Sequence, residues 1–263
     1  MNKIIKIALT TSLLVGAVAT TQACSLGAWD GNGTTSLAGG PGDANDFARY
    51  QGLCAMQTAG ATPTVLNNGI GGATSGPSGE ATMVARFYFL PGAASGDIFT
   101  TYEEDSPSTA VYTVSYSSPN VTVTPNGGGA PVVVAVGGTN WHSVEISWVN
   151  NGGAINVWVD SDATIDAADA STTSEASADV INSAVLGGSA GMIFDAYESR
   201  RTTAVGRLLR GDANADGTVN IGDAVGVVAE LNNVVTASGQ PDCTEDGVIN
   251  IGDAVCVVAI LNN

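Results

Sequence analysis

Residues 141–161 read WHSVEISWVNNGGAINVWVDS, and this stretch decides the fold of the N-terminal part of the chain. Two runs rich in Val, Ile and Trp, Trp141–Val149 and Ala154–Ser161, flank the residues Asn150-Asn151-Gly152-Gly153. An Asn-Gly pair in a two-residue turn is a strong signal for a β-hairpin. We therefore predict an antiparallel hairpin with Asn151-Gly152 at its turn.

The turn also sets which side chains of the hairpin share a face. It predicts an apolar face made of the cross-strand pairs Trp148 with Ile155, Ile146 with Val157, and Val144 with Val159. The other face then holds polar side chains and two tryptophans: Trp141, Ser143, Glu145, Ser147, Asn156, Trp158 and Asp160. The apolar face is the predicted core side, and the register and the residue pattern agree.

Other short runs within residues 24–200 have a similar composition. MVARFYFL, AVYTVSYS, VTVTP and PVVVAV are rich in Val, Tyr and Phe, and Gly, Pro and Asn separate them. No long helical period is visible there. Strands at this spacing are typical of a β-sandwich or jelly roll. We therefore predict a mainly β fold with one antiparallel sandwich over residues 24–200.

The order of features over roughly residues 80–200 resembles a laminin-G-like, concanavalin-type sandwich. The resemblance rests on Trp141-His142-Ser143-Val144 before a strand, on Ile155–Asp160 as a strand that ends in Asp, and on Phe194-Asp195-Ala196-Tyr197 near the end. Such a sandwich implies recognition of a glycan or of another surface.

The two tryptophans on the polar face of the hairpin make that face a candidate for sugar binding. A sugar ring is commonly held with its apolar side on an aromatic ring and its hydroxyls on polar neighbours. The candidate glycan-binding residues are Trp141, Glu145, Asn156, Trp158 and Asp160. The alternative is that an outer loop covers these tryptophans as ordinary packing, since one sequence does not say which faces are covered.

A catalytic pair of carboxyl groups is not apparent. Glycoside hydrolysis needs two facing carboxyls, and laminarinase-like enzymes of this fold carry Glu-x-Asp-x-x-Glu on one strand. The nearest match, Glu103–Ser108, has Ser108 in place of the second Glu and a strand-breaking Pro107. We interpret it as a loop of solvated acids and predict no catalytic residue. His142 is the only histidine, which excludes histidine-based zinc sites.

A repeat with a period of 30 residues occupies the C-terminus. GDANADGTVNIGDAVGVVAELNN (Gly211–Asn233) aligns with PDCTEDGVINIGDAVCVVAILNN (Pro241–Asn263). Each copy is a loop rich in Asp and Asn followed by an apolar helical stretch. Residues 201–210, RTTAVGRLLR, are predicted to be the linker between the sandwich and this module.

Each repeat begins with a loop that suits calcium, which takes about six to eight oxygen ligands from a sharply turning chain. Gly217 and Gly247 at the sixth loop position allow the sharp turn. The predicted ligands of two calcium ions are Asp212, Asn214, Asp216, Thr218, Asn220 and Asp223, and Asp242, Thr244, Asp246, Val248, Asn250 and Asp253. Thr244 is a neutral hydroxyl, so the second site is expected to be weaker. The alternative is a pair of Asx-rich turns that bind nothing.

Two loop–helix units of DxNxDGxxNxxD type, with no helix before the first loop, resemble a type I dockerin over Gly211–Asn263. The resemblance implies docking onto a cohesin domain, usually within extracellular polysaccharide-degrading systems. It places the partner-binding surface at Ile221, Gly222, Val228, Ala229, Ile251, Gly252, Val258 and Ala259. The best-known members carry Ser or Thr and basic residues there, so recognition in this chain would be largely apolar.

Four cysteines, two in each half of the chain, favour two disulfides in an exported protein. The simplest pairing joins Cys24 to Cys54 and Cys243 to Cys256. Cys243 and Cys256 are both confined to the second repeat, at positions that lie close together in a dockerin-like fold. The alternative for this pair is two buried free thiols.

Residues 1–23 have the form of a secretory signal peptide. A basic start precedes an apolar stretch from Ile7 to Ala19 that is too short to span a membrane, and small residues precede the cleavage point after Ala23. Lipidation of Cys24, the next residue, is an alternative. The chain is therefore expected to be secreted, in the extracellular space or at the cell surface.

The formal net charge of −17 at pH 7 disfavours nucleic acid and anionic lipid as partners. Together these features predict a secreted, non-catalytic binding protein. Its sandwich would recognise a polysaccharide or another surface, and its calcium-dependent dockerin would tether it to a cohesin-like domain. The alternatives are a glycoside hydrolase and a structural cell-surface protein.

Overall fold

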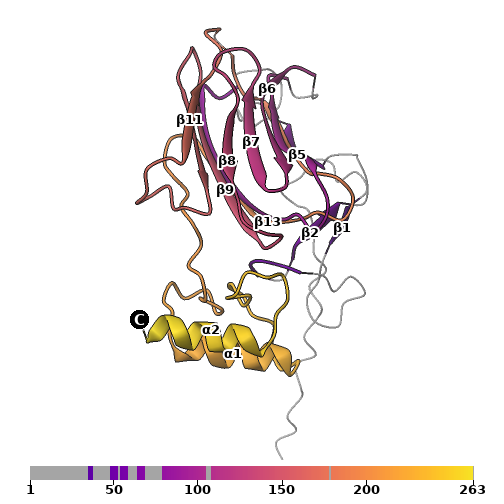
Figure 1. The fold of residues 1–263 in the computed structure, drawn as a ribbon, viewed down its shortest axis with the longest axis vertical. Helices are drawn as coiled ribbons and strands as arrows, with labels where there is room; N and C mark the ends of the chain where they lie inside the picture. The colour runs from indigo at the N-terminus through magenta and orange to yellow at the C-terminus, as the bar shows by residue number, and fades with distance from the viewer. Residues whose placement is uncertain are drawn as a thin grey trace, which may run out of the picture.

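The computed structural model describes residues 35–37, 48–52, 54–58, 64–68, 79–104, 108–177 and 179–262. Two antiparallel sheets form a layered sandwich, and a pair of helices lies beyond one end of it (Figure 1). The predicted signal peptide, residues 1–23, and Cys24 lie outside the described residues. Within the described residues, no helix is long and apolar enough to cross a membrane.

All strand pairings in the described sheets are antiparallel, as predicted for a β-sandwich. In spatial order, the 7-stranded sheet contains β1 (Thr35–Leu37), β2 (Met56–Thr58), β13 (Ile193–Arg200), β4 (Thr82–Leu90), β9 (His142–Val149), β10 (Ala154–Val159) and β11 (Ala170–Thr173). The 6-stranded sheet contains β3 (Thr64–Asn68), β12 (Ser183–Leu186), β5 (Gly96–Tyr102), β6 (Ala110–Ser117), β7 (Asn120–Pro125) and β8 (Val132–Ala135).

The hairpin formed by β9 and β10 has the register that its turn predicts. The pairs are Trp148 with Ile155, Ile146 with Val157, and Val144 with Val159, and all six side chains are buried. Asn151 has φ 54° and Gly152 has φ 72°. Both central turn residues therefore take the left-handed backbone that an Asn-Gly turn supplies, and the predicted core side of the hairpin is confirmed.

Aromatic side chains from both sheets fill the main core. Phe87 and Phe89 of β4, Trp148 of β9, and Tyr112 and Tyr116 of β6 are all buried in one cluster. Because side chains alternate along a strand, the neighbours of these residues point to the other face of their sheet. Burying each large apolar side chain contributes about 1.5–3 kcal/mol, so this core holds the two layers together.

A second, smaller core lies on the face of the 7-stranded sheet that points away from the main core. Tyr50 stacks on Tyr88 of β4, with ring centroids 3.8 Å apart, and meets Trp141 edge-on at 5.5 Å. Leu208 packs against this cluster. Leu208 belongs to residues 201–210, so the predicted linker packs on the sandwich along at least part of its length.

The C-terminal module consists of two loop–helix units whose helices, α1 (Ile221–Leu231) and α2 (Ile251–Leu261), lie side by side (Figure 1). Asn220 and Asn250 cap them, and each forms a capping box with the aspartate three residues later. Val227 and Val257 meet in a small core of their own. The two halves of the repeat thus fold as near copies of each other.

Candidate functional site

The carboxylate of the first aspartate in each C-terminal loop accepts backbone hydrogen bonds that hold the loop in a sharp turn. The Asp212 carboxylate accepts hydrogen bonds from the backbone N–H of Asp216 at 3.1 Å and of Gly217 at 2.9 Å. Asp242 accepts the equivalent bonds from Asp246 at 3.2 Å and Gly247 at 2.7 Å. The glycines have φ values of 83° and 85°, which L side chains rarely adopt. The same sharp turn is therefore built twice.

The last aspartate of each loop draws the two ends of the loop together. Asp223 is fully buried and accepts hydrogen bonds from the N–H of Asn214 at 3.1 Å and of Asn220 at 2.8 Å. Asp253 is likewise buried and accepts from the N–H of Thr244 at 2.8 Å and of Asn250 at 2.7 Å. Positions 3, 9 and 12 of each predicted shell are thus brought together.

The donor set of these loops suits a hard cation. The predicted side-chain ligands are carboxylate, amide and hydroxyl oxygens, which calcium prefers. Within the described residues, no group of three or more His, Cys, Asp or Glu side chains is arranged to hold a metal ion. Each predicted shell contains three aspartates, which are of these residue types, so the structure does not arrange their carboxylates as a metal shell. The loops therefore fit calcium by the chemistry of their donor atoms.

The second loop differs from the first in its ligands and its electrostatics. The Thr244 hydroxyl donates to Asp253 Oδ1 at 2.8 Å, whereas the first loop has Asn214 at this position. Burial raises the pKa of Asp242 to about 7, and the negative charges of Asp253 and Asp246 add to the rise. A cation among these carboxylates would relieve their mutual repulsion.

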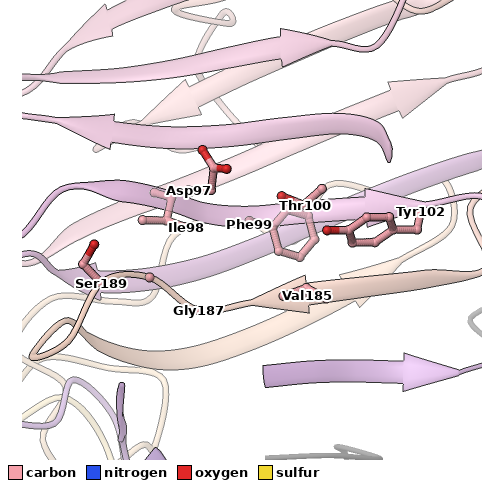
Figure 2. A pocket seen from close by; sticks show the side chains of 9 residues that line it. Asp97, Ile98, Phe99, Thr100, Tyr102, Val185, Gly187 and Ser189 are labelled. Carbon is pink, nitrogen blue, oxygen red and sulfur yellow. The ribbon is translucent and has the colours of Figure 1, made fainter. Parts of the chain in front are cut away.

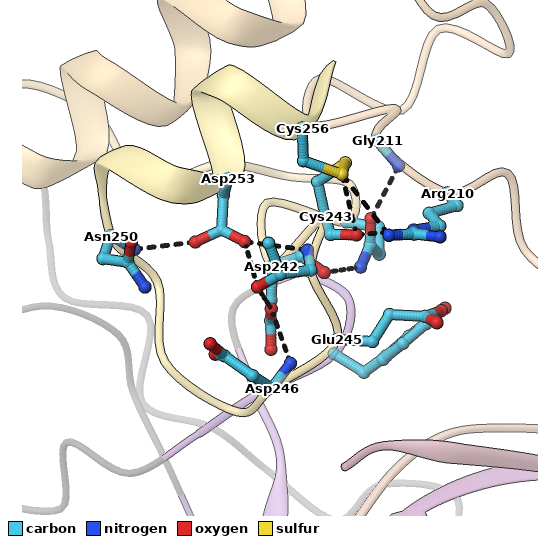
Figure 3. The surroundings of a disulfide bond; sticks show 12 residues. Arg210, Gly211, Asp242, Cys243, Glu245, Asp246, Asn250, Asp253 and Cys256 are labelled. Carbon is cyan, nitrogen blue, oxygen red and sulfur yellow. Dashed lines mark hydrogen bonds between the residues drawn. A yellow bond between two sulfur atoms is a disulfide. The ribbon is translucent and has the colours of Figure 1, made fainter. Parts of the chain in front are cut away.

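A disulfide ties the second loop to its helix. Cys243 and Cys256 are bonded, with Cα atoms 5.9 Å apart, and Arg210 Nε donates to the Cys243 carbonyl at 2.5 Å (Figure 3). This predicted pairing is confirmed. Cys54 is also disulfide-bonded, while its predicted partner Cys24 lies outside the described residues. Disulfides are typical of oxidising compartments.

An apolar groove runs between the two helices. Its lining consists of Ala224, Val225, Val228, Ala254, Val255 and Val258, and its volume is about 310 Å³. Val225 and Val255 are 62% and 64% exposed. The acidic residues of the helices, Asp223, Glu230 and Asp253, are buried elsewhere. The groove is therefore uncharged.

The sequence analysis anticipated part of this surface. Ile221 and Ile251 are each 63% exposed, and Gly222, Val228, Val258 and Ala259 are exposed as well. Gly252 and Ala229 are half-buried. The valines at the centre of the groove, Val225 and Val255, were missed. Their spacing of four residues from the isoleucines places them on the same helix face and would have revealed them.

The predicted glycan-binding face of β9 and β10 is largely covered. Trp141 and Glu145 are only 2% and 3% exposed. The Glu145 carboxylate accepts hydrogen bonds from the N–H of Val205 and of Gly206, each at 2.8 Å, so residues of the linker lie over it. The prediction that Trp141 and Glu145 contact a glycan is therefore wrong. The sequence could not show this, because the cover comes from a segment about 60 residues away.

The other candidates on this face have partners within the protein. The half-buried Trp158 donates from Nε1 to the Asp166 carbonyl at 3.1 Å. Asn156 accepts from the Ser171 hydroxyl at 3.0 Å. Asp160 lies 2.8 Å from His142 Nδ1 and accepts from the Ser143 N–H. Trp158 lies opposite Glu145, as the predicted register requires.

A different cavity lies over the paired strands β5 and β12 and the turn that follows β12 (Figure 2). Its volume is about 240 Å³, and Asp97, Thr100, Tyr102, Val185 and Ser189 contribute to its lining. Burial raises the pKa of Tyr102, so its hydroxyl stays protonated at neutral pH. The cavity thus combines an aromatic ring with a carboxylate and hydroxyls. Sequence reasoning missed it because β5 and β12 are distant along the chain.

Burial raises the pKa of Glu103 in the acidic segment after β5, and the neighbouring carboxyl of Asp179 adds to the rise. Glu104 is half-buried and accepts hydrogen bonds from the Thr109 hydroxyl and N–H, which lower its pKa. Asp105, Ser106 and Pro107 lie outside the described residues. His142 is 2% exposed, so it is not presented to a substrate.

No family model matches the chain, and no curated protein is similar to it. Solved structures with a partly similar fold include the LG4-5 domains of the mouse laminin α1 chain, with 14% identity, a TM-score of 0.40, and coverage of 61% of this chain and 48% of that one. The galectin LEC-6 of Caenorhabditis elegans has 14% identity, a TM-score of 0.34, and coverage of 59% and 94%. The Trypanosoma rangeli sialidase has 9% identity, a TM-score of 0.39, and coverage of 57% and 26%. The chain thus spans about half of the laminin chain and a quarter of the sialidase.

Proposed function

We propose that this chain is an exported, non-catalytic binding protein that binds two calcium ions and docks onto a cohesin-like domain through the groove between α1 and α2. The observation that carries the proposal is the exposed, uncharged groove built on two matched loops. Exposed apolar surface of this kind marks interaction sites in soluble proteins.

Bound calcium would fix the conformation of the two loops and therefore the position of the helix that follows each loop. In the first loop the ligands would be Asp212, Asn214, Asp216, Asn220 and Asp223, with the Thr218 carbonyl. In the second they would be Asp242, Thr244, Asp246, Asn250 and Asp253, with the Val248 carbonyl. Each helix begins at its loop's cap, so ordering the loop also fixes the start of the helix.

The partner must offer an apolar surface. The groove presents matched valines from the two repeats, and its flanks carry Ile221 and Ile251 rather than charged residues. Burial of apolar area, rather than ion pairing, would then drive the association. Such binding should change little with salt concentration, because screening acts on charges.

The test is binding of the full-length chain to a panel of immobilised, purified cohesin domains, in calcium and in chelator. The double substitution Val225→Asp, Val255→Asp should abolish binding that the wild type shows in calcium. Both side chains are more than 60% exposed, so the charges are tolerated in the folded chain. Val133→Asp, at a 57% exposed site on β8, is the matched control and should bind like the wild type.

Two outcomes of this experiment would contradict the proposal. Either no cohesin binds the wild type, or the double variant binds as well as the control. A dimer of the wild type in light scattering that the double variant loses would assign the groove to a second copy of the chain instead.

For the sandwich, we propose that a saccharide binds in the cavity over β5 and β12. Tyr102 supplies an aromatic ring at one end of the cavity, and Asp97 and Ser189 supply a carboxylate and a hydroxyl at the other end, which are groups that suit a saccharide (Figure 2). Retention on arrayed polysaccharides should fall for Tyr102→Ala and persist for Trp158→Ala. If retention instead falls for Trp158→Ala and persists for Tyr102→Ala, the binding site lies on the β10 face. Release of reducing sugar would favour the alternative of a glycoside hydrolase. A sandwich that neither binds nor cleaves a glycan would leave the structural cell-surface role.

A further inference from the structure

The fourth position of each C-terminal loop differs between the two repeats. It is Ala215 in the first loop and Glu245 in the second, and both have φ 61°. Ala215 is exposed, whereas the Glu245 side chain is only 13% exposed. The same backbone conformation therefore directs one side chain to solvent and the other into the protein. Figure 3 shows Glu245 pointing away from Asp242 and Asp253, on the other side of the loop.

The Glu245 carboxylate is held by two side chains of the sandwich and the linker. The Tyr50 hydroxyl donates to Oε1 at 2.6 Å. Arg207 Nη2 donates to Oε1 at 2.9 Å and to Oε2 at 3.0 Å. Arg207 also donates from Nη1 to the Asp160 carbonyl of the sandwich at 3.1 Å. One carboxylate thus connects the loop to the small core around Tyr50.

The backbone of the second loop is attached to the sandwich as well. The Trp141 N–H donates to the Glu245 carbonyl at 2.8 Å. A Cβ on Gly247 would lie 2.7 Å from Leu90 Cδ2 at the end of β4, whereas a Cβ on the equivalent Gly217 would meet nothing within 4 Å. Only the second loop, therefore, packs against the sandwich in this way.

A separate ion pair fixes the first helix. Arg49 forms a buried ion pair with Glu230 near the end of α1, and the other Glu230 oxygen accepts from the Ala237 N–H at 2.9 Å. The Gly52 N–H also donates to the Gly239 carbonyl at 3.0 Å, and the Gly239 N–H donates to the Ala213 carbonyl of the first loop at 2.9 Å, so the module is attached to the sandwich at three or more places. Breaking a buried pair by removing one partner leaves an uncompensated charge, which opposes separation of the two parts.

We propose that calcium binding by the second loop and docking of the module on the sandwich are coupled, while the first loop, which is connected to Gly52 through Gly239, is coupled to the sandwich more weakly. The inference rests on the proposed calcium function. Thr244 and Asp246, two predicted ligands, are the chain neighbours of Glu245. A backbone shift that spoils the metal shell must therefore move the docking contacts, and coupling of this kind acts equally in both directions.

Coupling has a consequence for how the groove is presented. With calcium in the second loop, the helices hold a fixed orientation on the sandwich rather than moving on a flexible tether. The Trp141 amide reports this state directly, because its hydrogen bond goes to the Glu245 carbonyl.

Calorimetric titration of calcium into the full-length chain tests the coupling. Glu245→Ala gives the second loop the residue that the first loop already carries in the same conformation. It should weaken calcium binding at the second loop at least about fivefold, and Ala215→Gln should leave the first loop unchanged. The two sites are resolved by disabling the other loop with Asp216→Ala or Asp246→Ala.

Hydrogen exchange of the wild type provides a measurement that needs no variant. Removing calcium should raise the exchange rate of the Trp141 amide at least about fivefold. Suppose that two ions bind, that Glu245→Ala changes the affinity of neither site, and that the exchange rate of the Trp141 amide is the same with and without calcium. The coupling is then refuted, and the proposed calcium function stands. If no calcium binds, both fall together.

Discussion

At the scale of single residues, the two loops differ most at their third position. Asn214 offers an amide oxygen, whereas the Thr244 hydroxyl is already bonded to Asp253. Asp212→Ala and Asp223→Ala remove charged ligands and should each weaken calcium binding by about tenfold or more, since charge count sets affinity in such loops. Thr244→Ala should cost less. Titration of each variant with calcium checks the order, and an equal or larger loss for Thr244→Ala would be inconsistent with the assigned ligands.

Asp242 makes the stability of the calcium-free protein depend on pH. Burial raises its folded pKa from an ordinary value of 3.8 to about 7, so the fold favours the protonated form. The stability gained is complete below about pH 4 and is lost as the pH rises through 7. In chelator, the wild type should therefore lose stability relative to Asp242→Asn between pH 4 and 8, as measured by thermal melts. A difference that stays constant over this range would contradict the raised pKa.

At the scale of secondary structure elements, the turns and helices could be predicted from the sequence. Which face of a strand is covered by a distant segment could not. The register of β9 and β10 followed from Asn151-Gly152, and the two helices followed from the repeat. The turn and the helix caps depend on residues that are close together in the chain, so a local sequence pattern is enough to predict them. Which face of β9 is exposed depends on Val205 and Gly206, which no local pattern connects to Glu145.

The disulfide in the second repeat should stabilise the C-terminal module. Cys243 and Cys256 join the second loop to α2, with a separation of 13 residues. Replacing both with the residues of the first repeat, Cys243→Ala and Cys256→Gly, should destabilise the module by about 3 kcal/mol, because the bond restricts the unfolded chain. Thermal melts in chelator measure the loss, and peptide mapping without reductant should recover the Cys243–Cys256 pair. A bridge from either cysteine to Cys54 would overturn the division into two parts.

At the scale of the whole molecule, the few positive charges gather where the parts meet. Arg49 pairs with Glu230 of the module, Arg86 donates to the Gly206 carbonyl, and Arg207 binds Glu245. The sequence places three arginines within the linker, residues 201–210, but it does not show which groups they bind. A chain that is otherwise strongly acidic thereby holds its two parts together.

Glu145 tests whether the linker is part of the folded body. Glu145→Ala removes the acceptor for two backbone N–H groups, those of Val205 and Gly206. The substitution should destabilise the sandwich by about 1–3 kcal/mol for each buried donor left without a partner. Denaturant unfolding measures this loss, and Val133→Asp on the exposed surface serves as the control. An unchanged midpoint for Glu145→Ala would mean that the linker is only loosely attached.

Titrating calcium into the chelator-treated full-length chain in a calorimeter determines whether the repeated loops bind the ion. We expect two bound ions per chain and a higher melting temperature in calcium, since a ligand that binds only the folded state stabilises it by about 2.7 kcal/mol at a concentration 100 times Kd. The absence of binding heat together with an identical melt in calcium and in chelator would contradict calcium binding by the loops.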